Sequence, residues 1–219
     1  LISGCEDKEA EEQLVVESFS ITLVDKITTG DETQSQPELI RFVTDELGVI
    51  VNSEQNSVDF INITPSGITM SGQSVQITQD ADADASSIDV SVDESILAVV
   101  VSKGACLRGE LYLINTSTLQ KYGPYELGFN PDAVDIAVDN KFVVVVNEFD
   151  YEDGVDGGCQ TLGFPGVSVY DISAGIDKAT LVKDMKISHT GSNGNLAEPE
   201  GVKIAPNGDT VYMTLQESN

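Results

Sequence analysis

Runs of alternating apolar and polar residues recur along this chain, and each is followed, after a polar turn, by a run of β-branched residues. Four copies of this pattern align on an Asp- or Asn-centred turn and cover residues 37–53, 87–102, 131–148 and 199–215. The turn positions Asp45, Asp93, Asp139 and Asn207 are 48, 46 and 68 residues apart. Alternation across a short polar turn predicts two paired antiparallel strands. The pattern therefore predicts four antiparallel hairpins.

Further strand signals follow each of the first three hairpins. The stronger signals cover 58–63, 111–115 and 167–172, and the weaker ones cover 74–77, 119–122 and 181–187. Four strands per repeat, with repeats about 40 to 50 residues apart, is typical of β-propeller blades. The predicted fold is all-β, a propeller of four-stranded antiparallel blades that holds the first three to four blades of a larger ring. A β-sandwich with coincidental spacing is the alternative.

The N-terminal residues predict a targeting signal and a tether before the propeller. Leu1-Ile2-Ser3-Gly4-Cys5 resembles the last residues of a bacterial lipoprotein signal peptide. The resemblance implies cleavage before Cys5 and lipidation of Cys5, which would hold the protein on a membrane surface. A chance cysteine in a frayed terminus is the alternative. The expected division is 1–4 signal remnant, 5–13 acidic tether and 14–219 partial propeller, with repeats near 37–80, 87–128, 131–190 and 199–219.

The charge of the chain excludes one class of partner. The sequence has 37 Asp and Glu against 11 Lys and Arg, a formal net charge of −26. Phosphate binding requires clustered Lys and Arg, so we expect no nucleic-acid partner. No run of 18 apolar residues is present to span a bilayer as a helix. The acidity also agrees with solubility in salty water.

Acidic loops are the candidate metal sites. The loop leading into the first strand of a blade and the loop between its second and third strands lie at the same end of a propeller, so several acidic loops should share one face. Carboxylates near a turn glycine are ligands that Ca²⁺ accepts. Asp80, Asp82 and Asp84 begin like a calcium loop, but Ala85 stands where glycine belongs, which favours a solvated loop. The stronger candidate, open between an ion site and a solvated loop, comprises Glu148, Asp150, Glu152, Asp153 and Asp156, with Gly154.

Three further residues are candidate ligands on the same face. Asn147 ends a strand there, and Glu198 and Glu200 lead into the fourth hairpin. Asn147 and Glu148 could instead be turn-forming residues.

Two cysteines fall in equivalent loops of neighbouring repeats. Cys106 and Cys159 each follow a hydrophobic second strand, and an oxidising envelope compartment would favour a disulfide between them. Two unpaired thiols are the alternative. The chain lacks the G-x-S-x-G, H-E-x-x-H and phosphate-loop motifs, and its single histidine, His189, sits in a polar loop.

The repeats resemble the bacterial secreted propellers known as choice-of-anchor domains, which are related to YVTN-type surface-layer propellers. The matching segments are 131–148, 166–173 and 198–217. Some relatives carry alkaline-phosphatase or esterase-like-phytase labels. The resemblance implies attachment to the cell surface. Together with the Leu1–Cys5 sequence and the acidic loops, it favours a lipid-anchored binding or scaffold module of the bacterial envelope or cell surface, with a protein or surface polymer as ligand and Ca²⁺ as support. The alternative is a calcium-dependent phosphoesterase, in which metal ions polarise a phosphate ester and activate water.

Overall fold

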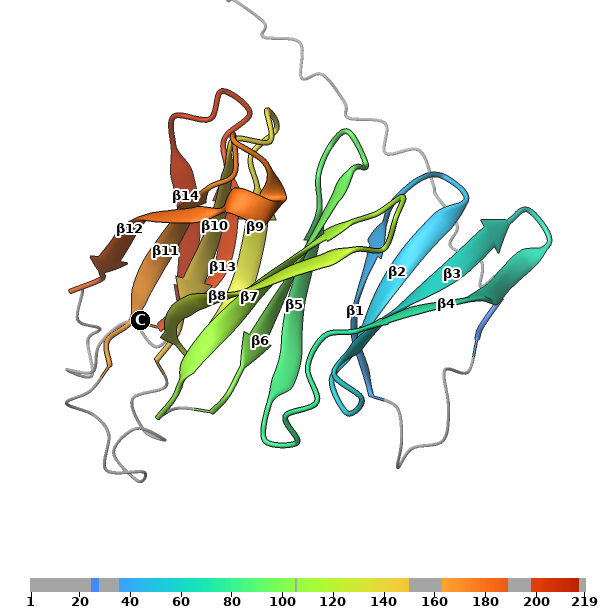
Figure 1. The fold of residues 1–219 in the computed structure, drawn as a ribbon, viewed down its shortest axis with the longest axis horizontal. Helices are drawn as coiled ribbons and strands as arrows, with labels where there is room; N and C mark the ends of the chain where they lie inside the picture. Colours follow the sequence, from blue (N-terminus) through green and yellow to red (C-terminus); the bar gives the residue numbers. More distant parts are fainter. Residues whose placement is uncertain (1–24, 28–35, 105, 150–162, 189–197, 217–219) are drawn as a thin grey trace, which may run out of the picture.

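The computed structural model describes residues 25–27, 36–104, 106–149, 163–188 and 198–216. Within these ranges the chain forms strands and one short 3-10 helix, η1 (Ile176–Lys178) (Figure 1). The first sheet contains β1 (Pro37–Phe42), β2 (Leu47–Asn52), β3 (Ser57–Thr64) and β4 (Gly67–Gln76), and the second contains β5 (Asp84–Val90), β6 (Ile96–Ser102), β7 (Arg108–Asn115) and β8 (Lys121–Phe129). The third contains β9 (Pro131–Ile136), β10 (Phe142–Asn147), β11 (Gly166–Asp171) and β12 (Thr180–Lys186), and the fourth contains β13 (Glu198–Ile204) and β14 (Val211–Gln216).

Each of the first three sheets is an antiparallel meander in chain order, from its first strand at one edge to its fourth at the other, and the described part of the fourth sheet is the antiparallel pair β13–β14. The sheets stand side by side in Figure 1, and the first strands of successive sheets contact one another. The all-β class and the four-stranded antiparallel blades are confirmed, and the arrangement is that of a β-propeller. None of the helices in the described ranges is long and apolar enough to span a membrane.

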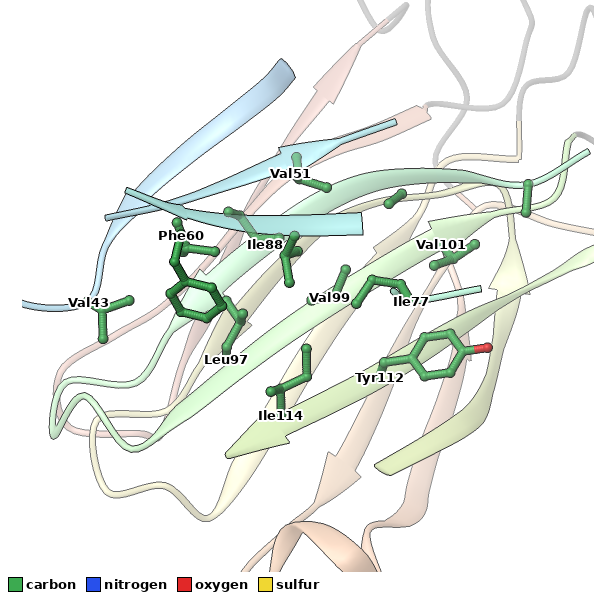
Figure 2. Close-up of a cluster of buried hydrophobic side chains, with 14 residues drawn as sticks. Val43, Val51, Phe60, Ile77, Ile88, Leu97, Val99, Val101, Tyr112 and Ile114 are labelled. Atoms are coloured by element: carbon green, nitrogen blue, oxygen red, sulfur yellow. The ribbon is translucent and has the colours of Figure 1, made fainter. Parts of the chain in front are cut away.

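Apolar side chains between neighbouring sheets form the core. All seven residues of β6 are buried, as its near-continuous β-branched sequence predicts for a strand covered on both faces. Odd-numbered residues of β6, such as Val99, pack toward the first sheet, and even-numbered residues, such as Val100, pack toward the third. Figure 2 shows the first of these clusters, in which Phe60 of the first sheet faces Leu97 of the second. Burial between the sheets is therefore the main force that holds blade against blade.

A directional contact accompanies this packing along the first strands. The Asp89 carboxylate on β5 accepts a hydrogen bond from the Ile136 N–H on β9, at 2.9 Å. The Asp135 carboxylate, at the same position of β9, accepts one from the Ile204 N–H on β13, at 2.7 Å. Each bond joins one sheet to the next, so the same carboxylate–amide link occurs at two successive interfaces.

Cations at the equivalent position of the flanking sheets face these aspartates. The Arg41 Nε atom on β1 lies 3.7 Å from Asp89 Oδ1, and Lys203 on β13 forms an ion pair with Asp135. Burial raises the pKa of Asp89, while the hydrogen bond from Ile136 opposes that rise. Asp135 is only 2% exposed, so its charge depends on the Ile204 N–H and on Lys203 for compensation.

We predict that Asp135→Ala destabilises the protein by about 2 kcal/mol, because it leaves a buried N–H without its acceptor and removes the partner of Lys203. Urea unfolding of the two proteins, followed by circular dichroism, measures the difference. Asp209→Ala is the matched control, since Asp209 is exposed in a turn, and it should change the free energy of unfolding by less than about 0.5 kcal/mol. Equal effects of the two substitutions would contradict the role given to Asp135.

Candidate functional site

Two classes of loop meet at one end of each sheet, as the repeat pattern predicts. Asn52, the last residue of β2, lies opposite Pro37 of β1 and Ser57 of β3. In the third sheet Asn147 lies opposite Pro131 and Gly166 in the same way. In the three four-stranded sheets the start of the first strand therefore lies beside the loop that joins the second and third strands.

A β-bulge recurs at this end of all four described sheets. The register of each first strand shifts at the residue seven positions before the turn residue of its hairpin, which is Glu38, Ser86, Asp132 and Glu200 in turn. A bulge leaves one residue outside the ladder and redirects its side chain, and bulges are frequent beside functional sites. We refer to the end of the sheets that carries these four residues as the bulge end.

Two of the bulge residues form an acidic pair between the third and fourth sheets. Partial burial and the negative charge of Glu200 raise the pKa of Asp132 to about 6. The Gln216 side-chain amide, oriented to donate, lies 2.8 Å from Glu200 Oε2. Asp132 and Glu200 therefore come together from β9 and β13, although 68 residues separate them in the sequence.

The other two bulge residues bond within the protein. The Ser86 hydroxyl donates to the Pro131 carbonyl at 3.1 Å and so joins the second sheet to the third. The Ser53 hydroxyl donates to a carboxylate oxygen of Glu38 at 3.2 Å. Glu38 itself is exposed, so its carboxylate remains accessible to a ligand.

Asn147 joins neighbouring strands by side-chain hydrogen bonds at the bulge end of the third sheet. Its side chain is 1% exposed, accepts a hydrogen bond from the Gly128 N–H at 2.9 Å and donates one to the Ser168 hydroxyl at 3.0 Å. A Cβ at residue 128 would lie 2.5 Å from Asn147 Cγ, so glycine is required there. These bonds link β8, β10 and β11, and contact of Asn147 with a ligand stays a prediction.

The remaining candidate ligands are placed only in part. Glu148 accepts a hydrogen bond from the Asn130 side-chain amide at 2.8 Å, and Glu198 is buried at the start of β13. Asp150, Glu152, Asp153 and Asp156 lie outside the described residues. Within the described ranges no three His, Cys, Asp or Glu side chains converge as a metal site. A calcium site at the Glu148–Asp156 loop stays a prediction.

The loop of Asp80, Asp82 and Asp84 shows no converging carboxylates. Asp82 and Asp84 are exposed, whereas the Asp80 carboxylate accepts a hydrogen bond from the Asp82 N–H at 3.2 Å. Asp80 also lies 3.5 Å from the Lys103 ammonium. A solvated loop without an ion stays a prediction.

Cys106 is disulfide-bonded. Cys5 and Cys159, the other two cysteines of the chain, both lie outside the described residues. Cys159 as the partner of Cys106 stays a prediction.

Two cations that the sequence analysis passed over lie near the bulge end. The Arg108 guanidinium ion-pairs with Glu126 at 2.9 Å and with Asp184 of the third sheet at 3.3 Å. The Lys103 ammonium lies 3.2 Å from a carboxylate oxygen of Glu110. Both cations line a pocket of about 300 Å³ with Gly109, Glu110, Pro124 and Glu126. The pocket therefore carries charges of both signs, each with a partner inside the protein.

Comparison with known proteins identifies the family. Residues 40–219 match the model of the choice-of-anchor I domain. The chain belongs to this family. Choice-of-anchor I membership indicates a module associated with the cell surface or envelope. No curated protein matches this choice-of-anchor chain.

Solved structures agree with the propeller fold. The choice-of-anchor chain is similar to a candidate 6-phosphogluconolactonase from Bacteroides uniformis, with 12% identity, a TM-score of 0.62 and coverage of 84% of this chain and 49% of that one. It is similar to Kuenenia stuttgartiensis hydrazine synthase, with 14% identity, a TM-score of 0.60 and coverage of 81% and 49%. It is also similar to a Lactobacillus plantarum protein, with 14% identity, a TM-score of 0.59 and coverage of 84% of this chain and 51% of that one. The chain thus spans about half the length of these structures, and identities this low show the fold alone.

Proposed function

We propose that this choice-of-anchor protein is a lipid-anchored module of the bacterial envelope that binds a protein or surface polymer at its bulge end. Family membership supports the association with a surface. The Leu1–Cys5 sequence supports the finer statement that a lipid on Cys5 provides the anchor, with the acidic segment 5–13 as its tether.

The recurrence of the bulge is the observation that supports the proposed position of the binding site. A bulge at the same position of four successive first strands turns one side chain per blade out of the ladder, and three of the four are carboxylates. Binding sites require a few polar groups held in fixed positions by a rigid scaffold. The inter-sheet core and the bonds of Ser86 and Asn147 supply that rigidity at the bulge end.

The charge of this end selects the chemistry of the ligand. Glu38, Asp132 and Glu200 are acidic, and the net charge of −26 attracts cations from a distance. The proposed ligand therefore presents ammonium groups, as a lysine-rich segment or an aminated polymer does. Calcium in the Glu148–Asp156 loop would neutralise part of this acidity and stabilise the loop beside the site.

The binding proposal predicts that a fluorescent trilysine peptide binds the chain at pH 7.5 and that Asp132→Asn with Glu200→Gln weakens binding about tenfold, since two carboxylates are lost. Fluorescence anisotropy measures the affinity. Because Asp132 takes up a proton near pH 6, while lysines keep their charge, wild-type affinity should fall between pH 7.5 and 5.

The control for general charge is Asp45→Asn with Asp209→Asn, which removes two exposed carboxylates from turns at the opposite end of the sheets. It should change the affinity less than twofold. Equal losses in the two double variants would show attraction by net charge alone and would overturn the bulge-end site.

The anchor and the metal predict separate results. In bacterial cells that express the chain behind a complete lipoprotein signal peptide, Cys5→Ser should move the protein from the membrane fraction to the soluble fraction. A Cys5→Ser protein that stays in the membrane fraction would contradict lipid anchoring.

Calcium should raise the melting temperature of the purified chain, because a ligand of the native state stabilises it. A melting temperature that is the same in calcium and in chelator would contradict the calcium site.

A further inference from the structure

The hairpin turn between β13 and β14 carries an asparagine that is followed directly by a glycine. Asn207, Gly208 and the next residue, Asp209, are all exposed. The chain has one further Asn-Gly pair, at 193 and 194, which lies outside the described residues. Asparagine is one of the chemically labile side chains of proteins. The side chain of Asn207 is therefore in contact with water at a point where the main chain can react with it.

Glycine after asparagine favours attack of the main chain on the side chain. The nitrogen of the following residue can bond to the side-chain carbonyl carbon and close a five-membered ring, and glycine has no Cβ to hinder that approach. The other asparagines of the described ranges are followed by serine, serine, isoleucine, threonine, proline, lysine and glutamate; they are Asn52, Asn56, Asn62, Asn115, Asn130, Asn140 and Asn147. Within these ranges Asn207 thus has the least hindered neighbour.

The contacts of the turn polarise the carbonyl group that would react. The Asp209 N–H donates to Asn207 Oδ1 at 3.3 Å. A donor at that oxygen stabilises the negative charge that develops on it when a nucleophile adds to the carbonyl carbon. The Gly208 N–H donates to the Ala205 carbonyl at 2.8 Å, so this bond has to open before the Gly208 nitrogen attacks. Opening of an exposed turn costs little free energy compared with opening of a buried strand.

We propose that Asn207 is a site of spontaneous deamidation. The Gly208 nitrogen bonds to Asn207 Cγ, the bond from Cγ to the side-chain nitrogen breaks, and the Gly208 proton leaves with that nitrogen as ammonia. The product is a cyclic imide. Water then adds to one of the two imide carbonyls and opens the ring. Opening on one side leaves aspartate, and opening on the other side leaves isoaspartate, in which the main chain runs through the side-chain carboxyl carbon.

The repeat shows how each product would fit the turn. The residues that correspond to Asn207 in the second and third sheets are Asp93 and Asp139, whose Oδ1 atoms accept the N–H groups of Ser95 and Lys141 at 3.2 Å each. Aspartate at position 207 can accept the N–H two residues later in the same way, so this product keeps the hairpin. Isoaspartate adds a methylene group to the main chain and should loosen the pairing of β13 with β14. The turn lies at the opposite end of the sheets from the bulge residues, so this site is independent of the proposed binding site.

The test is incubation of the full 219-residue chain in mildly alkaline buffer, with peptide mapping by mass spectrometry at intervals. Deamidation of Asn207 should be at least about tenfold faster than that of Asn140, which lies in the corresponding turn of the third sheet but precedes lysine. Fragmentation by electron transfer should show both aspartate and isoaspartate at position 207, because both form when a cyclic imide opens.

Gly208→Asn is the matched variant for the attacking residue. The corresponding residue of the third sheet, Asn140, has a φ of 55°, close to the 76° of Gly208, and asparagine tolerates this left-handed conformation. A Cβ at Gly208 would meet no atom within 4 Å. The substitution should therefore keep the hairpin and slow deamidation of Asn207 at least about fivefold.

Asn207→Asp copies the direct product of the reaction. Because Asp93 and Asp139 occupy the same turn position, this variant should have the melting temperature of the unmodified chain.

Three results would overturn the proposal. The first is an Asn207 that stays intact in the native chain while it deamidates in a urea-unfolded sample under the same conditions. The second is an equal rate in the native chain and in Gly208→Asn, since the Gly208 nitrogen would then not be the attacking group. The third is aspartate without isoaspartate at position 207, which would show direct hydrolysis of the side chain.

Discussion

The carboxylate–amide link between neighbouring first strands is the constraint on which the arrangement of the sheets depends. Apolar packing supplies most of the attraction between sheets, but it is non-directional and would tolerate sliding of one sheet on the next. The bonds from Asp89 to Ile136 and from Asp135 to Ile204 are directional, and burial makes it costly to leave either carboxylate without its partner. They therefore fix the position of β9 against β5 and of β13 against β9.

The candidate site follows from that alignment. When the first strands are held at a common level, their bulges fall at a common level too, and side chains far apart in the sequence meet at one end. Asp132 and Glu200 meet in this way, and burial together with the negative charge of Glu200 raises the pKa of Asp132. Asn147 and Ser86 tie the same end together across strands and sheets. The repeat therefore builds both the scaffold and the site.

The sequence predicted the inner strands well because they are buried. The β-branched runs of β2, β6 and β10 lie between sheets. Because both faces of these strands are covered, their residues are nearly all apolar, and the sequence therefore reveals their burial. The outer strands are solvated, and β4 and β8 were predicted too short, over 74–77 and 119–122, because exposed strands need no apolar alternation. β12 was located from 181–187.

The polar residues were harder to interpret. Asp89 and Asp135 occupy the same position of two repeats, each between apolar neighbours, and that repetition was a usable signal of a buried carboxylate with a fixed donor. The bulge at Asp132 carried no such signal, since a bulge depends on pairing and not on composition. The pairing of Arg108 with Asp184 depends on how two sheets face each other, which spacing along the chain does not give.

The most direct test of this account is amide hydrogen exchange, measured by NMR, at Ile136 and Ile204 in the native protein. If the carboxylate links align the sheets, both amides should exchange as slowly as those at the centre of β6 and β10, because they open only when the sheets separate. Exchange at either amide as fast as in the exposed strand β12 would show that the links are not maintained, and would contradict the central claim.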